Sequence, residues 1–161
     1  MKTIVTGGAG FIGSWVVDSL IEKGHEVVVI DNLSSGTKSN LNLKARFYQA
    51  DILNDLDAVF EIEKPEYVFH LAAQINVRKS IEDPKKDAEI NILGALNLID
   101  NCVKHGVKKI IFSSSGGAIY GEKEIIPTSE DAETSPESPY GIAKRTIELY
   151  LEFYKKVFGL D

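Results

Sequence analysis

The sequence has little of several features that mark whole classes of protein. Its 161 residues include one cysteine, Cys102, so no internal disulfide can form, and we expect a reducing, cytoplasmic location with Cys102 in the core. No apolar run approaches the roughly 18 residues of a membrane span. The amino terminus lacks the long apolar segment of a secretory signal. These absences predict a soluble protein that does not act on a membrane.

Positive charge is also scarce, because 18 Lys and Arg stand against 24 Asp and Glu. The net charge of −6 argues against nucleic acid as a partner. No cluster of His, Cys, Asp and Glu has the spacing of metal ligands, so no metal is predicted. The acids Asp55, Asp57, Glu61 and Glu63 are interpreted as a solvated helix face, and His70 as a structural histidine.

What the sequence does contain is an alternation of apolar strands and amphipathic helices. Apolar residues make up 43% of the chain, enough for one domain with a real core. Strands are predicted over residues 2–6, 26–31, 45–51, 66–73 and 108–115, and helices over residues 11–24, 53–65, 84–106 and 138–159. This order favours an α/β fold, with a doubly wound parallel sheet that binds ligands beyond the carboxyl ends of its strands.

The first predicted strand leads into a glycine-rich turn, TGGAGFIG. Gly7, Gly10 and Gly13 have the spacing G-x-x-G-x-x-G between a strand and a helix. Such a turn needs positive φ, and it lets the backbone approach a pyrophosphate that a Cβ would block. The start of the helix offers unpaired N–H groups and the positive end of its dipole. The context indicates a dinucleotide site on a Rossmann-like sheet.

Two aspartates end the next two strands. Asp31 is placed to accept hydrogen bonds from a ribose 2′-hydroxyl and would repel a 2′-phosphate, so NAD is favoured over NADP. Lys38 keeps NADP from being excluded. Asp51 either reaches an adenine ring or caps the turn that follows its strand; the sequence favours neither reading.

A tyrosine and a lysine stand four residues apart in SPYGIAKR. On a helix, Tyr140 and Lys144 lie on one face. A free phenol has a pKa of about 10 and is a poor base, but a nearby ammonium and a cationic nicotinamide both lower that pKa. The phenolate can then take a proton from an alcohol while the nicotinamide takes a hydride. The hydroxyls of Ser113–Ser115, after the fifth strand, are placed to hold the alcohol oxygen.

Taken together, these motifs resemble a known family. TGGAGFIGS, DNLSSG, HLAAQ, NILGA, FSSSGGAIYGE and SPYGIAK occur in this order along the whole chain. They resemble the extended short-chain dehydrogenase/reductases, and most of all the UDP-glucose 4-epimerases and related sugar-nucleotide epimerases. The resemblance implies an NAD-dependent isomerase of galactose metabolism. It would epimerise C4 of a UDP-hexose, UDP-glucose or UDP-galactose, through a 4-keto intermediate.

The resemblance also implies roles for individual residues. The pyrophosphate is wrapped by Gly7, Gly10, Phe11, Ile12 and Gly13; the adenosine ribose is held by Asp31, Asn32, Leu33, Ser34, Ser35 and Gly36; the adenine meets Asp51 and Ile52; and the nicotinamide side is lined by Leu71, Ala72, Ala73 and Gln74, with Asn91 behind it. Tyr140 is the implied base, and Lys144 binds the nicotinamide ribose and tunes Tyr140. Ser115 binds the sugar hydroxyl. Because the SGGA segment carries an extra residue compared with the family's SSSATVYG form, Ser114 stays open for that role.

Two departures from the family pattern matter. Gly116, Gly117 and Ala118 follow Ser115 where related 4,6-dehydratases carry an acid pair, so elimination of water is not expected. Full family members are also much longer. Residues 1–161 are therefore expected to be an NAD-binding domain truncated before the substrate-binding subdomain, with impaired turnover. The alternatives are a stand-alone or engineered NAD-binding domain without turnover, and a related nucleotide-sugar reductase or decarboxylase.

The end of the chain predicts self-association. With no strand beyond it, the fifth strand would be an apolar edge with unpaired backbone groups, and such edges recruit partners. The apolar stripe of the last helix, through Tyr140, Ile147, Leu151 and Tyr154, is a second surface that a copy can cover. We therefore expect a homodimer, with exchange of the last helix as one route.

Overall fold

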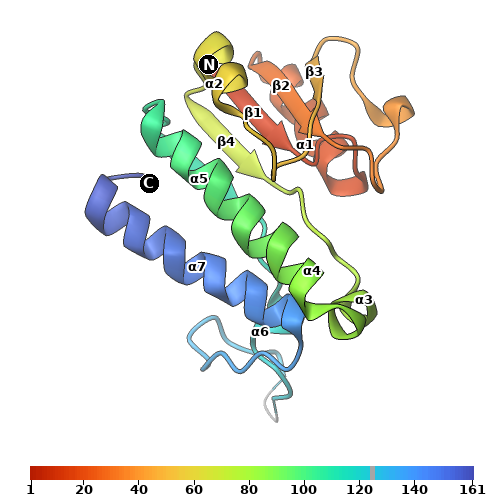
Figure 1. The fold of residues 1–161 in the computed structure, drawn as a ribbon, viewed down its shortest axis with the longest axis vertical. Coiled ribbons are helices and arrows are strands. Elements are labelled where there is room, and N and C mark those ends of the chain that lie inside the picture. Colours follow the sequence, from red (N-terminus) through yellow and green to blue (C-terminus); the bar gives the residue numbers. More distant parts are fainter. Residues whose placement is uncertain (124–125) are drawn as a thin grey trace.

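The computed structural model describes residues 1–123 and 126–161, and a parallel sheet lies at its centre (Figure 1). The described residues form five strands in the order β3-β2-β1-β4-β5. Their bounds are β1 (Lys2–Thr6), β2 (Glu26–Asp31), β3 (Arg46–Gln49), β4 (Tyr67–His70) and β5 (Lys109–Phe112). Every neighbouring pair is parallel. The predicted Rossmann-like fold is confirmed, although β3, β4 and β5 are shorter than expected.

Five helices of the described residues fall within the predicted helical segments. They are α1 (Phe11–Glu22), α2 (Asp57–Glu63), α4 (Pro84–Ala88), α5 (Gly94–Lys104) and α7 (Pro139–Phe158), and a π-helical turn, η2 (Glu89–Leu93), joins α4 to α5. Three short elements lie in segments with no predicted helix: η1 (Lys38–Asn40), α3 (Val77–Glu82) and α6 (Gly116–Ile119). Elements this short are too brief for helical periodicity to reveal them. In α3 the Asn76 side chain caps the helix, because it accepts from the backbone N–H of Lys79 (3.1 Å).

Helices cover both faces of the sheet, and each face has its own apolar cluster. On one face α1 packs against β1 and β2, and the cluster contains Val5, Val17, Leu20, Val27 and Val29. On the other face α2, α5 and α7 cover the strands, and the cluster includes Ile4, Ile30, Phe60, Leu98, Cys102 and Ile147. Cys102 lies in this core as predicted, where burial raises the pKa of its thiol. With both faces occupied, the strand ends are the places left for a site.

One acid assigned to a solvated helix face is in fact buried. Glu63 is 1% exposed, so that prediction is wrong. Its carboxylate accepts from the Arg46 guanidinium (2.6 Å), the Tyr48 hydroxyl (2.6 Å) and the Lys2 ammonium (3.3 Å). Burial alone would raise the pKa of Glu63, but these hydrogen bonds together lower it. Lys2, Arg46 and Tyr48 come from β1 and β3, so no spacing around Glu63 in the sequence reveals them.

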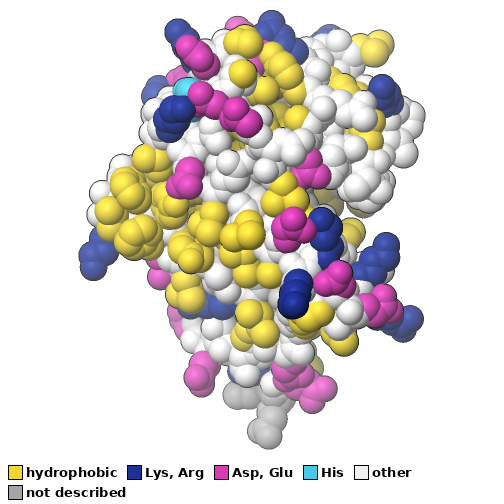
Figure 2. Space-filling model, in the orientation of Figure 1, with side chains coloured by type: hydrophobic (Ala, Val, Ile, Leu, Met, Phe, Trp, Pro, Cys, Tyr) yellow, Lys and Arg dark blue, Asp and Glu magenta, His cyan; other side chains and the backbone are white. Residues whose placement is uncertain are grey.

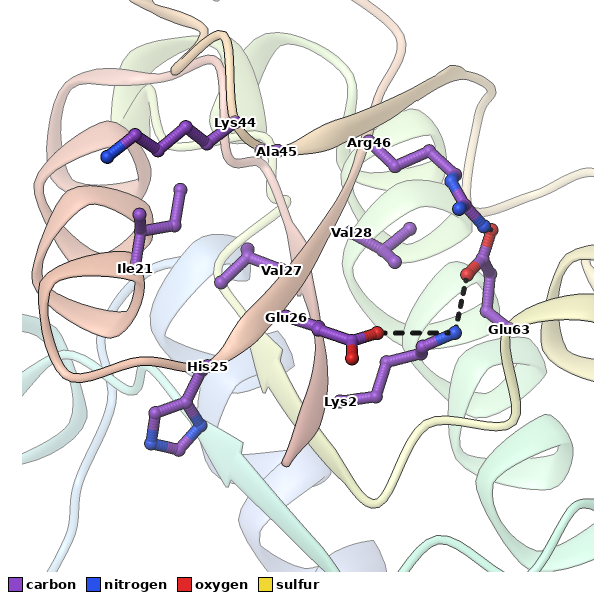
Figure 3. Close-up of a pocket in the computed structure, with 10 residues that line it drawn as sticks. All are labelled: Lys2, Ile21, His25, Glu26, Val27, Val28, Lys44, Ala45, Arg46 and Glu63. Atoms are coloured by element: carbon purple, nitrogen blue, oxygen red, sulfur yellow. Dashed lines mark hydrogen bonds and ion pairs between the residues drawn. The ribbon is translucent and has the colours of Figure 1, made fainter.

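The Glu63 network lines a cleft of about 480 Å³. Figure 3 shows Lys2 reaching both Glu63 and Glu26, with Arg46 against Glu63. Lys2, Glu26 and Arg46 are the first residues of β1, β2 and β3, so the cleft lies at the amino ends of these strands. The charges tie the strand starts to the end of α2. Ligands of parallel α/β sheets bind at the opposite, carboxyl ends.

The edge strand β5 is less open than predicted. Its Ile110 N–H donates to the Asp161 carbonyl (2.8 Å). The Asp161 carboxylate pairs with Lys109 and Lys155, each at 2.6 Å. Leu160 is buried, with 4% exposure. The last two residues therefore cover part of the edge, and only the remainder fits the unpaired strand that was expected.

His70 is buried at the end of β4, as predicted for a structural histidine. It is 2% exposed, and its Nδ1 lies 2.8 Å from the Thr6 hydroxyl on β1. Burial, and to a lesser degree the charge of Lys144, lowers the pKa of His70 to about 3. The folded chain therefore holds this ring neutral.

We expect His70 to make the fold sensitive to acid. The pKa is about 3 when folded and 6.5 in the reference state, so the contribution of His70 is complete above pH 6.5 and is lost as the pH falls toward 3. Between pH 7 and pH 4.5 the loss should be about 2–3 kcal/mol. Urea unfolding at both pH values should show a smaller loss for His70→Asn than for the parent. His25→Asn, at a partly exposed histidine, is the control, and an equal loss in His70→Asn would contradict the assignment.

Candidate functional site

The segments singled out in the sequence meet at the carboxyl ends of the strands. Residues 7–13 follow β1, Asp31 ends β2, residues 71–74 follow β4 and residues 113–115 follow β5. Helix α7 reaches the same edge, because the Lys144 ammonium donates to the carbonyl of Ser113 (2.8 Å). The structure thus brings together residues that are far apart in the chain, at the edge where such sheets bind ligands.

The glycine turn is shaped by close backbone contacts. Gly7 has a φ of +73°, and a Cβ there would lie 2.6 Å from the backbone nitrogen of Ala72. A Cβ at Gly13 would lie 2.1 Å from the carbonyl oxygen of Gly7. The N–H of Gly10 donates to that same carbonyl (3.0 Å). Only glycine fits at Gly7 and Gly13, and α1 therefore begins with its backbone close to the strand ends.

Asp31 is tied into this turn. Its Oδ2 accepts from the N–H of Ala9 (3.0 Å), and its Oδ1 accepts from the N–H of Leu33 (2.8 Å). The residue is 7% exposed. Next to it, Gly36 passes so close to Ala9 that a Cβ on Gly36 would lie 2.8 Å from the Ala9 carbonyl. Asp31 thus has a structural role in addition to any contact with a ribose.

Asp51 performs the turn-capping role that the sequence left open beside adenine binding. Its Oδ1 accepts from the N–H of Leu53 (2.9 Å), and its Oδ2 accepts from the Asn32 amide (2.7 Å). Ile52 is 4% exposed, with its side chain against Gly94 of α5. At this position the structure shows a core contact for Ile52, so its predicted contact with adenine stays a prediction.

Helix α7 begins at the site with a well-formed cap. The Ser138 hydroxyl accepts from the N–H of Gly141 (3.1 Å), and Pro139 occupies the first turn. Tyr140 is partly buried, and its backbone N–H donates to the hydroxyl of Ser80 on α3 (3.2 Å). This anchoring fixes the start of α7, and with it the origin of the tyrosine side chain.

Lys144 is a buried cation. It is 4% exposed, and its ammonium nitrogen lies 4.6 Å from the ring centroid of Phe112 and 5.8 Å from that of Tyr140. Burial lowers the pKa of Lys144 to about 8, and the charge of Asp87 on α4 partly opposes that change. At neutral pH the side chain is therefore mostly charged and lies on the same face of α7 as Tyr140.

The three serines after β5 differ in their contacts. Ser113 offers its carbonyl to Lys144. The Ser114 hydroxyl donates to Glu148 of α7, which also pairs with Arg145 (2.9 Å). Ser115 precedes α6 in extended backbone conformation, and its side chain makes no capping hydrogen bond. The Ser114 hydroxyl is thus engaged within the protein, whereas the Ser115 hydroxyl does not cap the helix that follows it.

A buried polar network behind the site has one member, Asp87, that the sequence did not single out. Asn91 exchanges backbone and side-chain hydrogen bonds with Gln74 (2.8 and 2.9 Å). Both donate to Oδ1 of Asp87, at 2.8 Å from Gln74 and 2.9 Å from Asn91. Asp87 and Asn91 are four residues apart on one helical run, a spacing that was visible in the sequence. The network clamps the loop after β4 onto α4 and η2.

Two absences hold for residues 1–123 and 126–161, which the structure describes. Among these residues, no group of three His, Cys, Asp or Glu side chains is arranged to hold a metal ion. In that same part of the chain, no helix is both long and apolar enough to cross a membrane.

The chain is similar in sequence to sugar-nucleotide epimerases. Residues 3–161 match the profile described as the NAD dependent epimerase/dehydratase family. The chain is 47% identical over 159 residues to a putative UDP-glucose 4-epimerase of Methanocaldococcus jannaschii, a match that covers 98% of this chain and 52% of that protein. It is 46% identical over 167 residues to the UDP-glucose 4-epimerase of Mycolicibacterium smegmatis, covering 100% of this chain and 53% of that protein.

Solved structures show the same likeness. The UDP-glucose 4-epimerase of Thermotoga maritima, crystallised with UDP-glucose, has a TM-score of 0.97 and 53% identity over 99% of this chain and 53% of its own. The Thermus thermophilus enzyme, in complex with NAD, has a TM-score of 0.97 and 43% identity over 99% of this chain and 52% of its own. The chain spans about half the length of these relatives. It therefore belongs to the NAD dependent epimerase/dehydratase family, for which NAD is the cofactor.

Proposed function

We propose that this chain is the NAD-binding part of an enzyme that epimerises C4 of a UDP-hexose. The observation that carries the proposal is the placement of Tyr140 next to Lys144, whose ammonium donates to the Ser113 carbonyl, at the sheet edge that also contains the glycine turn. Relatives that are 46–47% identical and named UDP-glucose 4-epimerase support the substrate class.

The residues present fit a dinucleotide. Glycine at positions 7 and 13 lets the turn pack directly against the backbone of Ala72 and of Gly7, and this close packing brings the start of α1, with its unpaired N–H groups, to the strand ends where a pyrophosphate can bind. Phe11 and Ile12 on the first turn of α1 are 82% and 61% exposed, so they are free to flank it. Asp31 already accepts two backbone N–H groups, yet each carboxylate oxygen can accept a second bond, as a ribose hydroxyl requires. When bound, NAD supplies a reversible hydride acceptor.

The chain's own residues handle the proton. Tyr140 takes it from the 4-hydroxyl of the sugar and returns it to the 4-keto oxygen after the sugar has presented its other face. The Lys144 ammonium stabilises the phenolate form of Tyr140 between these steps. Ser115 holds the sugar oxygen, because the Ser114 hydroxyl is already bonded to Glu148.

The first prediction concerns cofactor choice. NAD should bind at least about tenfold more tightly than NADP, because the Asp31 carboxylate repels a 2′-phosphate. Isothermal titration with both nucleotides measures the ratio. Asp31→Asn removes the charge and keeps one acceptor oxygen for the turn, so the ratio of the NADP to the NAD dissociation constant should fall. Asp51→Asn removes a charge at the neighbouring turn and should leave this ratio near its value in the parent. Equal affinities in the parent would remove Asp31 from this role.

The second prediction concerns the base. In a longer form of the protein that converts UDP-galactose to UDP-glucose, Tyr140→Phe should lower turnover by about 10²–10⁴-fold. NAD binding should persist, because the ring is retained. Tyr150→Phe, at a partly exposed tyrosine on the same helix, is the matched control. Activity of Tyr140→Phe close to that of the parent would place the base elsewhere.

The same assay applies to the 161-residue chain alone. We expect NAD binding without turnover, because the chain spans only about half the length of the relatives that carry the activity in their names. Conversion of UDP-galactose by the purified 161-residue chain would contradict this expectation.

An exposed apolar face on α7 supports self-association. The stripe expected to pair with a copy instead packs inward: Ile147 is fully buried, and Leu151 and Tyr154 lie against the core. A different stripe faces outward, and we call it the α7 face: Ile142, Leu149, Phe153 and Val157, each 49–55% exposed. Figure 2 shows hydrophobic side chains gathered over this part of the molecule. We propose that a second copy of the chain covers the α7 face.

The third prediction tests that surface. Sedimentation over a concentration range should show a dimer at high micromolar concentration, because apolar patches of this kind mark association sites. The double substitution Leu149→Glu and Phe153→Glu should shift the chain to monomer and leave NAD binding intact. The control is Lys156→Glu, which changes an exposed charge on the same helix and should leave the chain dimeric. A monomeric parent at every concentration would reject the homodimer.

A further inference from the structure

Asp87 is a buried carboxylate for which the chemistry above has no use. It lies on α4, which packs against α7, and it is 2% exposed. Its Oδ1 accepts from Gln74 and Asn91, whereas its Oδ2 has no hydrogen-bond partner among the described residues. A buried carboxylate oxygen without a bond is unfavourable unless a positive charge lies near.

The positive charge is Lys144 on the facing helix. Burial raises the pKa of Asp87, and the hydrogen bonds of Gln74 and Asn91 and the charge of Lys144 oppose that change. Conversely, burial lowers the pKa of Lys144 to about 8, and Asp87 opposes that change. The two buried groups thus favour each other's charged form.

Other groups around Lys144 do not supply this counter-charge. His70 on β4 is neutral at physiological pH and would add positive charge if protonated. Glu148, one turn further along α7, is paired with Arg145. The charged side chains of α3 and η2 are exposed, Lys109 of β5 pairs with Asp161, and α6 carries no ionisable side chain. Among the described residues, and apart from Tyr140 itself, the carboxylate of α4 is therefore the group left to balance the ammonium.

We propose that Asp87 is a positioning residue of this site, which fixes the loop of Gln74 through Oδ1 and keeps Lys144 in its ammonium form through its negative charge. The inference rests on the proposed roles of Tyr140 and Lys144. A neutral Lys144 would not stabilise the phenolate of Tyr140. Because Lys144 is close to losing its proton at working pH, one nearby negative charge decides how much of it remains charged.

The test is a titration of Lys144 in the 161-residue chain by NMR of labelled lysine side chains, with the Lys144 signal assigned by its loss in Lys144→Met. Asp87→Asn keeps an acceptor oxygen for Gln74 and Asn91 but removes the charge. Its Lys144 midpoint should fall by about one pH unit. The control is Asp100→Asn, which removes a carboxylate of α5 that accepts a hydrogen bond from Tyr154, further along α7. The Lys144 midpoint in this variant should match that of the parent.

A second measurement needs no variant. In the parent, the carboxyl carbon signal of Asp87 should show an inflection near pH 8, where Lys144 loses its proton, because interacting groups titrate together. An unchanged Lys144 midpoint in folded Asp87→Asn, or no inflection at Asp87, would overturn the proposal.

A longer form that converts UDP-galactose to UDP-glucose would supply the functional readout. Asp87→Asn should move the alkaline limb of its pH–turnover profile to lower pH, because Lys144 then loses its proton at lower pH. An unmoved alkaline limb counts against the proposal. Failure of Tyr140→Phe to reduce turnover would instead reject the proposed function, while the lysine titration would still report on the Asp87–Lys144 pair.

Discussion

The hydrogen bond from the buried Lys144 ammonium to the Ser113 carbonyl joins the last helix to the end of β5, and the site depends on it. Burying a charged side chain beside Phe112, with 4% exposure, is unfavourable unless a polar group accepts a hydrogen bond from it. The bond also fixes the position of α7, and with it that of Tyr140, relative to the strand ends. A buried cation needs both a hydrogen-bond acceptor and a counter-charge, and the fold provides the carbonyl of Ser113 after β5 and the Asp87 carboxylate of α4.

Local patterns in the sequence predicted much of this arrangement. The glycine turn, the buried strands and the Ser138 cap are encoded by neighbours in the chain, and the structure has them where the sequence placed them. Hydrogen-bond and ion-pair partners that come from distant segments of the chain could not be predicted from the sequence. Glu63 looked like a solvated acid because Lys2 and Arg46 lie on other strands, and the outward stripe of α7 was misassigned because helical periodicity does not say which apolar stripe meets the core.

Several residues of the candidate site also hold the fold together, and this limits how freely they can change. Asp31 links the first and second strand ends through the N–H groups of Ala9 and Leu33. Gln74 and Asn91 tie the loop after β4 to the helix behind it. Substitutions at these positions combine a change in binding with a change in stability, so measurements of ligand affinity need a stability measurement beside them.

The π-helical turn between α4 and α5 has a consequence for how the long helix serves two environments. An α-helix advances by about 100° per residue, so the wider turn offsets the faces before and after it. One sequence run can therefore present Asp87 toward a polar neighbourhood and, further along, press Leu98 and Cys102 into the apolar core. Regular α-helical winding of the same residues Glu89–Leu93 would instead rotate one half of the run out of phase with its surroundings. The π-helical turn thus sets which side chains of the run face the polar network at the strand ends and which face the apolar core.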